Sequence, residues 1–438
     1  MKRIYLFLLT VCFLAGAQAQ KFYNLRYCLE LGLQNNYDLR IAHNNEEISD
    51  NNATWANAGL LPTLDFSAGY TGNVDKSQET NNAGVTTKTG NVFSQGVDVG
   101  LNLNWTLFDG LNMTAEYKRL RELKRQGETN TRIAIEDMVA NIASEYYNFI
   151  QQKIRLKNYL YAVSLSKERV RVAEMRHNIG SGSRLDFQQA LVDFNADSAQ
   201  YIKQQEALHT SRIRLNELMA VPDVDEFFII RDSLIDINAN LQFNELWDAT
   251  LATNASLLQA GQNLNIARLD YKKVRSRDYP YLRLNTGYGY TYNKYDSSSP
   301  TRKNGNWGFN AGLTLGFNLF DGNRRREFHN ARLEIENSEL ARQQLEQSLR
   351  ADLMNMWQAY KNNLNLLNLE RQNLITARDN HDIAIERYMQ GDLSGIEMRE
   401  AQQSLLDAEE RILSVQYDIK VCEISLLQLS GKILDYLR

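Results

Sequence analysis

Residues 97–110 read VDVGLNLNWTLFDG, and residues 307–322 read WGFNAGLTLGFNLFDG. In both stretches apolar residues alternate with polar or small ones, and both close on the same four residues, Leu-Phe-Asp-Gly. Strict alternation predicts a β-strand with one apolar face, and a length of about ten residues is typical of strands that cross an outer membrane. The recurrence of the ending after 212 residues indicates an internal duplication.

Individual residues on either side of these stretches recur at fixed offsets as well. Four residues recur 218 positions later, so that Leu33, Asn36, Leu39 and Pro62 correspond to Leu251, Asn254, Leu257 and Pro280. Four others recur after 211 positions, so that Gly180, Leu185, Asp186 and Ala190 correspond to Gly391, Ile396, Glu397 and Ala401. The chain is therefore predicted to be a tandem repeat of two units of roughly 200 residues.

The repeat gives a domain plan for the whole chain. We expect a signal peptide at 1–19, a first repeat at 20–220, a linker at 221–242 and a second repeat at 243–438. Each repeat should hold a leading helix, a β-hairpin, a long helix and a return helix. The leading helices are expected at about 25–58 and 243–277, the hairpins at 63–107 and 281–320, and the long helices at 111–179 and 323–390.

The hairpins contain four strands in all, each with an apolar and a polar face. The polar residues expected to face a water-filled lumen are Asp98, Asn102, Asn104, Arg283, Asn285 and Asn310. A soluble sheet that packs its apolar face on a helix would show the same alternation. Aromatic residues near the strand ends favour a bilayer, where such girdles lie at the interface. They are Trp105, Phe108, Tyr290, Tyr292, Trp307 and Phe320.

The long helices are predicted by the scarcity of glycine and proline in the segments that follow the hairpins. Only 4 prolines occur in the chain, residues 323–390 contain neither glycine nor proline, and Gly127 alone interrupts 111–179. Such a helix is about 100 Å long at 1.5 Å per residue. Asp109 and Asp321 are expected to cap these helices, and Gly180 and Gly391 to end them. Side-by-side packing is predicted by the spacing of Leu349, Leu353, Met356, Tyr360, Leu364, Leu367 and Leu374.

Composition and the N-terminus narrow the class of protein. The 438 residues are 43% hydrophobic and 23% charged with a formal net charge of −4, so the chain is not disordered and no nucleic-acid partner is expected. Lys2 and Arg3, an apolar run over 4–15 and the small-x-small ending at 17–19 predict cleavage and export. No later stretch of 18 apolar residues predicts a membrane-spanning helix, and no lipid-anchor pattern precedes Cys12 or Cys28.

Catalytic and metal-binding patterns are not found. The five histidines stand singly, the glycine-rich stretch 180–183 has no lysine of a phosphate-binding loop, and no nucleophile has a base at motif spacing. We therefore expect no enzyme activity, no cofactor and no metal. Cys28 and Cys422 are interpreted as free thiols that pack as small hydrophobes, with a disulfide between them as the alternative.

The order of these parts resembles the TolC-like outer-membrane efflux proteins over essentially the whole mature chain. The motifs that carry the resemblance are Phe108-Asp109-Gly110 with Phe320-Asp321-Gly322, and the turns 177–180 and 388–391. The resemblance implies a mixed α and β membrane protein, a homotrimer whose chains each give four strands to a 12-stranded transmembrane barrel, continued by a coiled-coil helical tunnel in the periplasm. Four strands cannot close a barrel alone, and open edges are not tolerated in lipid, so oligomerisation is expected on physical grounds too.

The resemblance also implies a function and partners. The chain would be the outer-membrane exit duct of a tripartite efflux or type I secretion system, conducting substrates passively from the periplasm. Its partners would be itself, outer-membrane lipid, a periplasmic adaptor and an inner-membrane RND or ABC transporter. Neither the transported substrate nor the class of transporter can be predicted from the sequence.

At the periplasmic tip the resemblance assigns roles to individual residues near the turns Gly180 and Gly391. Asp186 and Tyr388 match a pair that closes the tip, whether or not it is closed at rest, and Glu397 and Glu400 match an acidic ring that selects ions. Leu393 stands where better-known members carry an arginine link. Carboxylates in a first helical turn also simply favour the helix dipole, and this alternative for the two glutamates stays open.

A second class of function is compatible with the helical pattern. A secreted coiled-coil structural or adhesion protein would share the long helices and the leader. Detergent-dependent, heat-modifiable membrane fractionation distinguishes the two, since only a barrel protein shows it.

Overall fold

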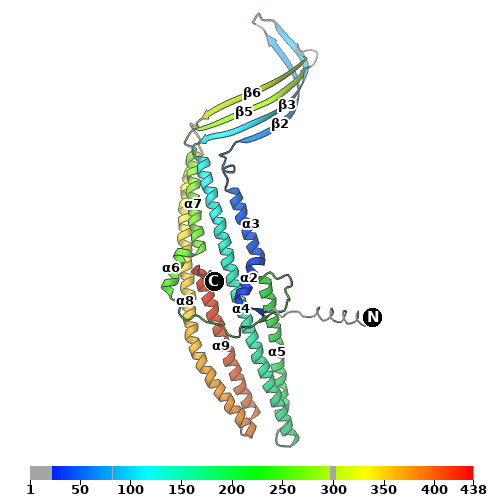
Figure 1. The fold of residues 1–438 in the computed structure, drawn as a ribbon, viewed down its shortest axis with the longest axis vertical. Coiled ribbons are helices and arrows are strands. Elements are labelled where there is room, and N and C mark those ends of the chain that lie inside the picture. The colour runs from blue at the N-terminus through cyan, green and yellow to red at the C-terminus, as the bar shows by residue number, and fades with distance from the viewer. Residues whose placement is uncertain (1–21, 81, 296–301, 438) are drawn as a thin grey trace, which may run out of the picture. The chain divides into compact units, whose positions relative to one another are not determined.

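The computed structural model describes residues 22–80, 82–295 and 302–437. The expected signal peptide at 1–19 lies outside the described residues. The chain divides into two compact units. The helical unit comprises residues 22–44, 129–258 and 344–437, and the sheet unit comprises 45–128 and 259–343. Figure 1 gives the labels used below.

The sheet unit contains one antiparallel sheet of four long strands. Its order is β2 (Thr63–Thr80), β3 (Thr86–Asp109), β5 (Tyr281–Tyr295) and β6 (Lys303–Gly316). The two central strands come from different repeats, so β3 and β5 join the halves of the chain. The outer strands β2 and β6 each have one neighbour in this sheet.

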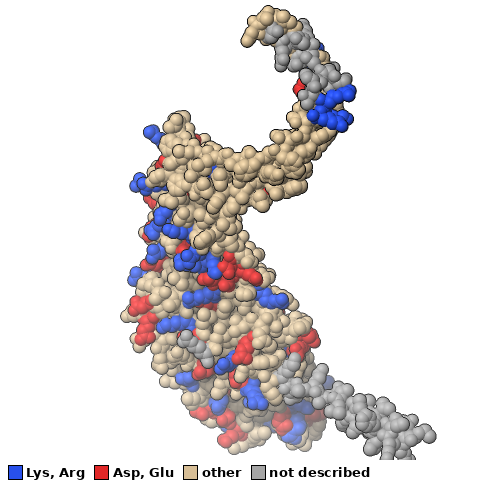
Figure 2. Space-filling model, turned by 45° about the horizontal axis from the view of Figure 1, so that its top comes forward, with Lys and Arg blue, Asp and Glu red and all other residues tan. Residues whose placement is uncertain are grey.

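The strand register gathers apolar residues on one face. A row across all four strands consists of Phe66, Leu101, Tyr288 and Phe309. In the single chain Phe66 is 70% exposed and Phe309 is 71% exposed, so the described part of the chain leaves them largely uncovered. Charged side chains are sparse on the visible face of the strands in Figure 2 and interspersed over the visible helices.

The opposite face is polar and contains glycine. One of its rows runs Asp65, Asn102, Gly287 and Asn310. The expected lumen residues Asp98, Asn104, Arg283 and Asn285 share this face by the same register. A Cβ on Gly287 would lie 2.8 Å from the side-chain oxygens of Asn102 and Asn310, so glycine makes room for their amides.

The second hairpin is shorter than the expected 281–320, because β6 ends at Gly316. Gly316 pairs with Tyr281, the first residue of β5, so the residues beyond it have no strand opposite them in this chain. In the first repeat β3 extends to Asp109 because β5 still lies beside it there. Leu319 and Phe320 are each 87% exposed instead of continuing the strand.

Two long helices of 67 residues each follow the hairpins, α4 (Asn112–Asn178) and α8 (Arg324–Gln390). Each is followed by a helix of 35 residues, α5 (Arg184–Leu218) and α9 (Gly395–Leu429). Within the helical unit, buried residues of α8 recur at seven-residue spacing at Leu353, Tyr360 and Leu367 and again at His381 and Tyr388, with the half-buried Leu374 at the position between the two runs. This spacing is typical of a left-handed coiled coil. Met356, expected in the stripe, is 36% exposed.

Each expected leading helix is two helices. The first repeat has α2 (Leu25–Asn35) and α3 (Tyr37–Asn52), and the second has α6 (Phe243–Thr253) and α7 (Ala255–Ser276). The break falls on the duplicated asparagine. Asn36 N–H donates to Gly32 O, ending α2, and Asn36 Oδ1 accepts from Leu39 N–H, starting α3. Asn254 does the same with Thr250 O and Leu257 N–H. One residue therefore caps two helices.

The duplicated asparagine also fixes the return helix of its own repeat. Asn36 Nδ2 donates to Leu218 O at the end of α5 (3.0 Å), and Asn254 Nδ2 donates to Leu429 O at the end of α9 (2.9 Å). The ends of the shorter helices therefore meet in both repeats.

The core of the helical unit packs α2, α4 and the ends of α5 and α9 around β1 (Phe22–Tyr23), which pairs in parallel with β4 (Ile229–Ile230) of the linker. Cys28 and Cys422 are free and buried. Burial raises the pKa of Cys28 to about 12, which keeps it a thiol. No helix in the described part of the chain is long and apolar enough to cross a membrane.

Candidate functional site

The tip of the first helical hairpin is a tight turn between α4 and α5. Gly180 has a φ of 77°, and the N–H groups of Ser181 and Gly182 both donate to Arg176 O at 2.9 Å. Ser183 then caps α5: its Oγ accepts from Asp186 N–H (3.1 Å), and the Asp186 carboxylate accepts from Ser183 N–H (3.3 Å). This reciprocal pair is a capping box.

The tip of the second hairpin, between α8 and α9, repeats this arrangement. Gly391 has a φ of 92°, which glycine adopts without steric cost. Ser394 Oγ accepts from Glu397 N–H (3.2 Å), and Glu397 Oε2 accepts from Ser394 N–H (3.0 Å). These bonds to Ser394 lower the pKa of Glu397 below its ordinary value. Glu400 lies three residues further along α9 and is exposed.

Asp186 and Glu397 therefore have the same local role in the two repeats. The resemblance assigned one to a closing pair and the other to an acidic ring, yet each is the third residue of a capped helix. The bonds to Ser394 give Glu397 a helix-capping role within the single chain. A ring would need three copies of the chain around one axis, and the structure describes a single copy.

Tyr388 lies where the two hairpins meet. Its side chain is 7% exposed and packs in a cluster with Val172 of α4 and Met398 of α9. The guanidinium of Arg176 lies over its ring at 4.7 Å, and Arg176 Nη2 donates to Tyr388 O at 2.5 Å. Burial raises the pKa of Tyr388, while Arg176 and Arg169 lower it.

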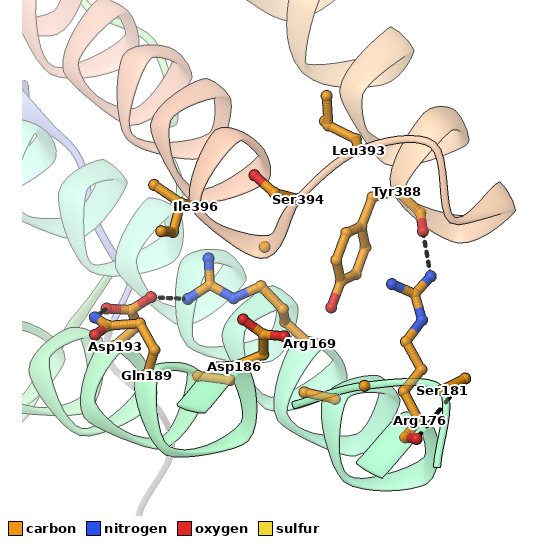
Figure 3. Close-up of a pocket in the computed structure, with 14 residues that line it drawn as sticks. Arg169, Arg176, Ser181, Asp186, Gln189, Asp193, Tyr388, Leu393, Ser394 and Ile396 are labelled. Atoms are coloured by element: carbon orange, nitrogen blue, oxygen red, sulfur yellow. Dashed lines mark hydrogen bonds and ion pairs between the residues drawn. The ribbon is translucent and has the colours of Figure 1, made fainter. Parts of the chain in front are cut away.

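Asp186 and Tyr388 line the same cavity (Figure 3), whose volume is about 200 Å³. Within the described residues no hydrogen bond joins them, and the Asp186 carboxylate accepts bonds from Ser183 through Oδ2. The structure therefore brings the expected pair to one cavity without the expected bond. Leu393 packs against the Tyr388 cluster from the edge.

A buried ionic network lies further along the same helices. Arg399 of α9 donates two bonds to the Asp197 carboxylate of α5, at 2.6 and 2.7 Å. Ser166 of α4 also donates to Asp197, and Gln402 donates to Ser166. Asp197 is 5% exposed and the Arg399 side chain is 22% exposed, so this largely buried pair connects the two hairpins. Beside it, Arg169 Nη2 donates to Asp193 at 2.6 Å, and burial lowers the pKa of Arg169.

Sequence reasoning missed the network and the two capping boxes. The boxes have a sequence signature, a serine three residues before an acid, at 183–186 and 394–397. The network has none, because Asp197 and Arg399 are 202 positions apart and neither is repeated. The equivalents 211 positions away are Ala408 and Gln188.

The strand-to-helix motif, in the sheet unit, differs between repeats. Both oxygens of Asp109 accept from Met113 N–H, at 3.1 and 3.0 Å, so Asp109 caps α4. Gly110 has a φ of 72°, and a Cβ there would meet Ser276 O at 2.2 Å. In the second repeat Asp321 Oδ1 accepts from Asn323 N–H (2.9 Å) just before α8, and Gly322 is not in the left-handed region. Phe108 continues β3 opposite Leu282 and is 38% exposed, whereas Phe320 lies beyond the end of β6 and is 87% exposed.

Among the described residues, no group of three or more His, Cys, Asp or Glu side chains could hold a metal ion. The chemistry that the tips offer is therefore ionic and hydrogen-bonded contact between helices.

Comparison with known proteins agrees with this architecture. The outer membrane efflux protein family matches residues 28–221 and 246–432. Outer membrane protein TolC of Vibrio cholerae serotype O1 is 22% identical over 389 residues, which are 86% of this chain and 84% of that protein. The Campylobacter jejuni CmeC outer membrane channel has a TM-score of 0.76 at 18% identity, covering 93% of this chain and 85% of that one.

The outer membrane protein VceC from Vibrio cholerae has a TM-score of 0.74 at 18% identity, covering 93% of this chain and 96% of that one. These structures share the fold, and the family match spans both repeats. The chain therefore belongs to the outer membrane efflux protein family: it is the outer-membrane channel component of a tripartite efflux system, it extends into the periplasm, and it is not an enzyme.

Proposed function

We propose that three copies of the chain form the channel, with their sheets closed into one 12-stranded barrel. The observation that carries this proposal is the four-stranded sheet with two open edges and an uncovered apolar face. Unpaired backbone groups at β2 and β6 are not tolerated in lipid. Pairing β6 of one copy with β2 of the next removes every edge.

The repeat predicts the register of this pairing between copies. Strands β3 and β6 are equivalent at an offset of 212, and strands β5 and β2 at an offset of 218. Within the chain, Leu101 of β3 lies opposite Tyr288 of β5. The equivalent pair is Leu313 on β6 of one copy and Tyr70 on β2 of the next.

Mass measurement in mild detergent tests the assembly. We expect a complex of three chains, and conductance in planar bilayers from that complex. A stable, closed monomer in the same detergent would contradict the proposal.

The tip is proposed to hold the channel shut between transport events. Asp186 and Tyr388 remain the proposed closing pair, supported by their common cavity. Arg176 adds a bond from α4 to Tyr388 O of α8, which supplies a cationic link where Leu393 offers none. We expect Tyr388→Phe, Asp186→Asn and Arg176→Gln each to raise basal single-channel conductance. Unchanged conductance in all three would remove the proposed closing role.

Glu397 and Glu400 are proposed to form a ring that favours cations in the trimer. Six carboxylates around a narrow axis lie within reach of a passing ion, since the Debye length is about 8 Å at physiological salt. The test is the reversal potential under a salt gradient for wild type and for Glu397→Gln with Glu400→Gln. Cation preference and divalent block that survive the double substitution would make these residues ordinary helix-start carboxylates.

The channel is proposed to receive substrates from an inner-membrane RND or ABC transporter through a periplasmic adaptor. Family membership supports this assembly in general, and the transporter chooses the substrate. The partners can be identified by co-purification, before and after crosslinking, from cells that express the transporter encoded beside this protein. Recovery of the trimer alone under both conditions would argue against a fixed assembly.

A further inference from the structure

The cavity at the meeting of the hairpins contains an unsatisfied buried cation. Arg169 is 5% exposed and lines the cavity. Its Nη2 donates to Asp193, whereas its Nη1 is buried and has no hydrogen-bond partner. Figure 3 shows the Arg169 guanidinium bonded to Asp193, with its other terminal nitrogen on the side of Ile396 at the start of α9. Leaving a buried donor without an acceptor costs free energy, and an acceptor bound in the cavity would remove this cost.

The same cavity is lined by the first residues of α9, which supply further donors. Gly395 and Ile396 are the first two residues of this 35-residue helix, so their N–H groups have no intrahelical carbonyl to bond. Such amides and the helix dipole favour an anion. Arg169 Nη1 and the start of α9 are thus two positive groups that line one space.

The charges around the cavity limit the kind of anion. Arg169 and Arg176 are balanced there by Asp186 and Asp193. Both carboxylates already accept bonds, Asp186 from Ser183 and Asp193 from Arg169 and Gln189. Because two arginines and two aspartates line the cavity, its net charge is near zero. The aspartates repel a multiply charged anion more than a singly charged one. Guanidinium and amide donors suit the two oxygens of a carboxylate.

We propose that this cavity binds one carboxylate group, with one oxygen on Arg169 Nη1 and the other on the N-terminal amides of α9. The bound group connects α4 of the first hairpin to α9 of the second. Its source is either a small free acid or an Asp or Glu side chain of a docked protein, and the two share this chemistry.

The test is calorimetric titration of the full chain, purified in detergent, with sodium acetate against a sodium chloride blank. Arg169→Lys keeps a cation for Asp193 and removes Nη1, so we expect it to weaken acetate binding about tenfold or more. The readout is binding alone, so it is independent of whether the tip closes the channel.

A matched pair at Gly395 tests the helix amide and does not disturb Arg169. Proline is well tolerated at the first position of a helix and removes only its N–H, and Ser394 has the extended backbone (φ −72°, ψ 155°) that a following proline needs. Gly395→Pro should weaken acetate binding about tenfold. Gly395→Ala keeps the N–H and should leave it unchanged, since a Cβ there meets no atom within 4 Å.

Crystals soaked in bromoacetate locate the ligand by its anomalous signal, which we expect beside Arg169 Nη1. N-acetylglutamic acid α-amide as a second titrant distinguishes the sources: binding like acetate indicates a protein side chain, and binding of acetate alone indicates a free acid. Both results support the site. Equal acetate affinity in wild type, Arg169→Lys and Gly395→Pro, or only water at Nη1 in the soaked crystals, would overturn it.

Discussion

The two helical hairpins of the helical unit have the same plan and different interiors. Helices α5 and α9 both have 35 residues and both begin with a capping box. Inside the first hairpin, Ser166 and Asp197 form a buried polar pair that receives Arg399 from the second. Inside the second, Ala408, the equivalent of Asp197, packs with Ala377 and Leu405. The duplication thus preserved the helical plan, while the Asp197–Arg399 pair makes these positions unequal between the hairpins and connects them.

The largest expected effect comes from removing the cation of that pair. Arg399→Gln introduces the residue found at the equivalent position 188 and leaves the Asp197 carboxylate buried without its charge partner. Breaking a buried pair from one side costs about 3–5 kcal/mol. Denaturant unfolding of the purified protein should show this loss. Arg171→Gln, at an exposed pair with Glu168, is the control and should change stability by less than about 1 kcal/mol.

Replacing both partners sharpens the comparison. Asp197→Ala gives the first hairpin the residue of the second (Ala408), Arg399→Gln gives the second the residue of the first (Gln188), and no uncompensated charge stays buried. We expect the double variant to recover most of the stability lost by Arg399→Gln, a coupling of about 2 kcal/mol or more in a double-mutant cycle. Additive losses would mean that the two residues stabilise the hairpins separately.

A smaller effect is expected at the duplicated asparagines, where the repeats are alike. Asn36→Ala and Asn254→Ala each remove a cap and a bond to the end of a return helix. Each should cost about 1–2 kcal/mol in urea unfolding. Asn45→Ala, at an exposed position of α3, is the control. A loss in only one of the two variants would show that the repeats differ here as well.

The smallest effect is a pH dependence of the α9 cap. The bonds to Ser394 lower the pKa of Glu397 in the folded chain below its ordinary 4.5. Its contribution is therefore present above that value and is lost as the pH falls through the folded pKa. Glu397→Gln keeps an acceptor without the charge, so its difference from wild type in urea midpoint should be present at neutral pH and vanish under acid conditions. A difference that grows in acid would contradict the assigned direction.

Features carried by local pattern and repetition could be predicted from the sequence. Alternation predicted the strands, the lack of glycine and proline predicted the long helices, and the signature motifs indicated the family, which the family match confirms. The early end of β6 could not be predicted, since it depends on where β5 begins. The helix breaks fall on Asn36 and Asn254, which repetition singled out without revealing that one asparagine caps two helices.

The candidate site was less predictable because its partners lie far apart in sequence. The family resemblance, matched from Gly180 and Gly391, led to Tyr388 and Asp186, but the residues that contact them, Arg176 and Ser183, were not anticipated. Asp197 and Arg399 meet only after both hairpins have folded. Long-range charge pairs leave no periodic signal in a single sequence.

The central claim is that open sheet edges of neighbouring copies pair to make the channel. Disulfide crosslinking tests it most directly, with Leu313→Cys and Tyr70→Cys in a chain whose buried Cys28 and Cys422 are replaced by alanine. The repeat-derived register predicts covalent trimers on denaturing gels after oxidation. Thr71→Cys in place of Tyr70→Cys puts the second thiol on the opposite face of β2 and should give none. Monomers alone from the first pair, or equal crosslinking from both, would contradict the account.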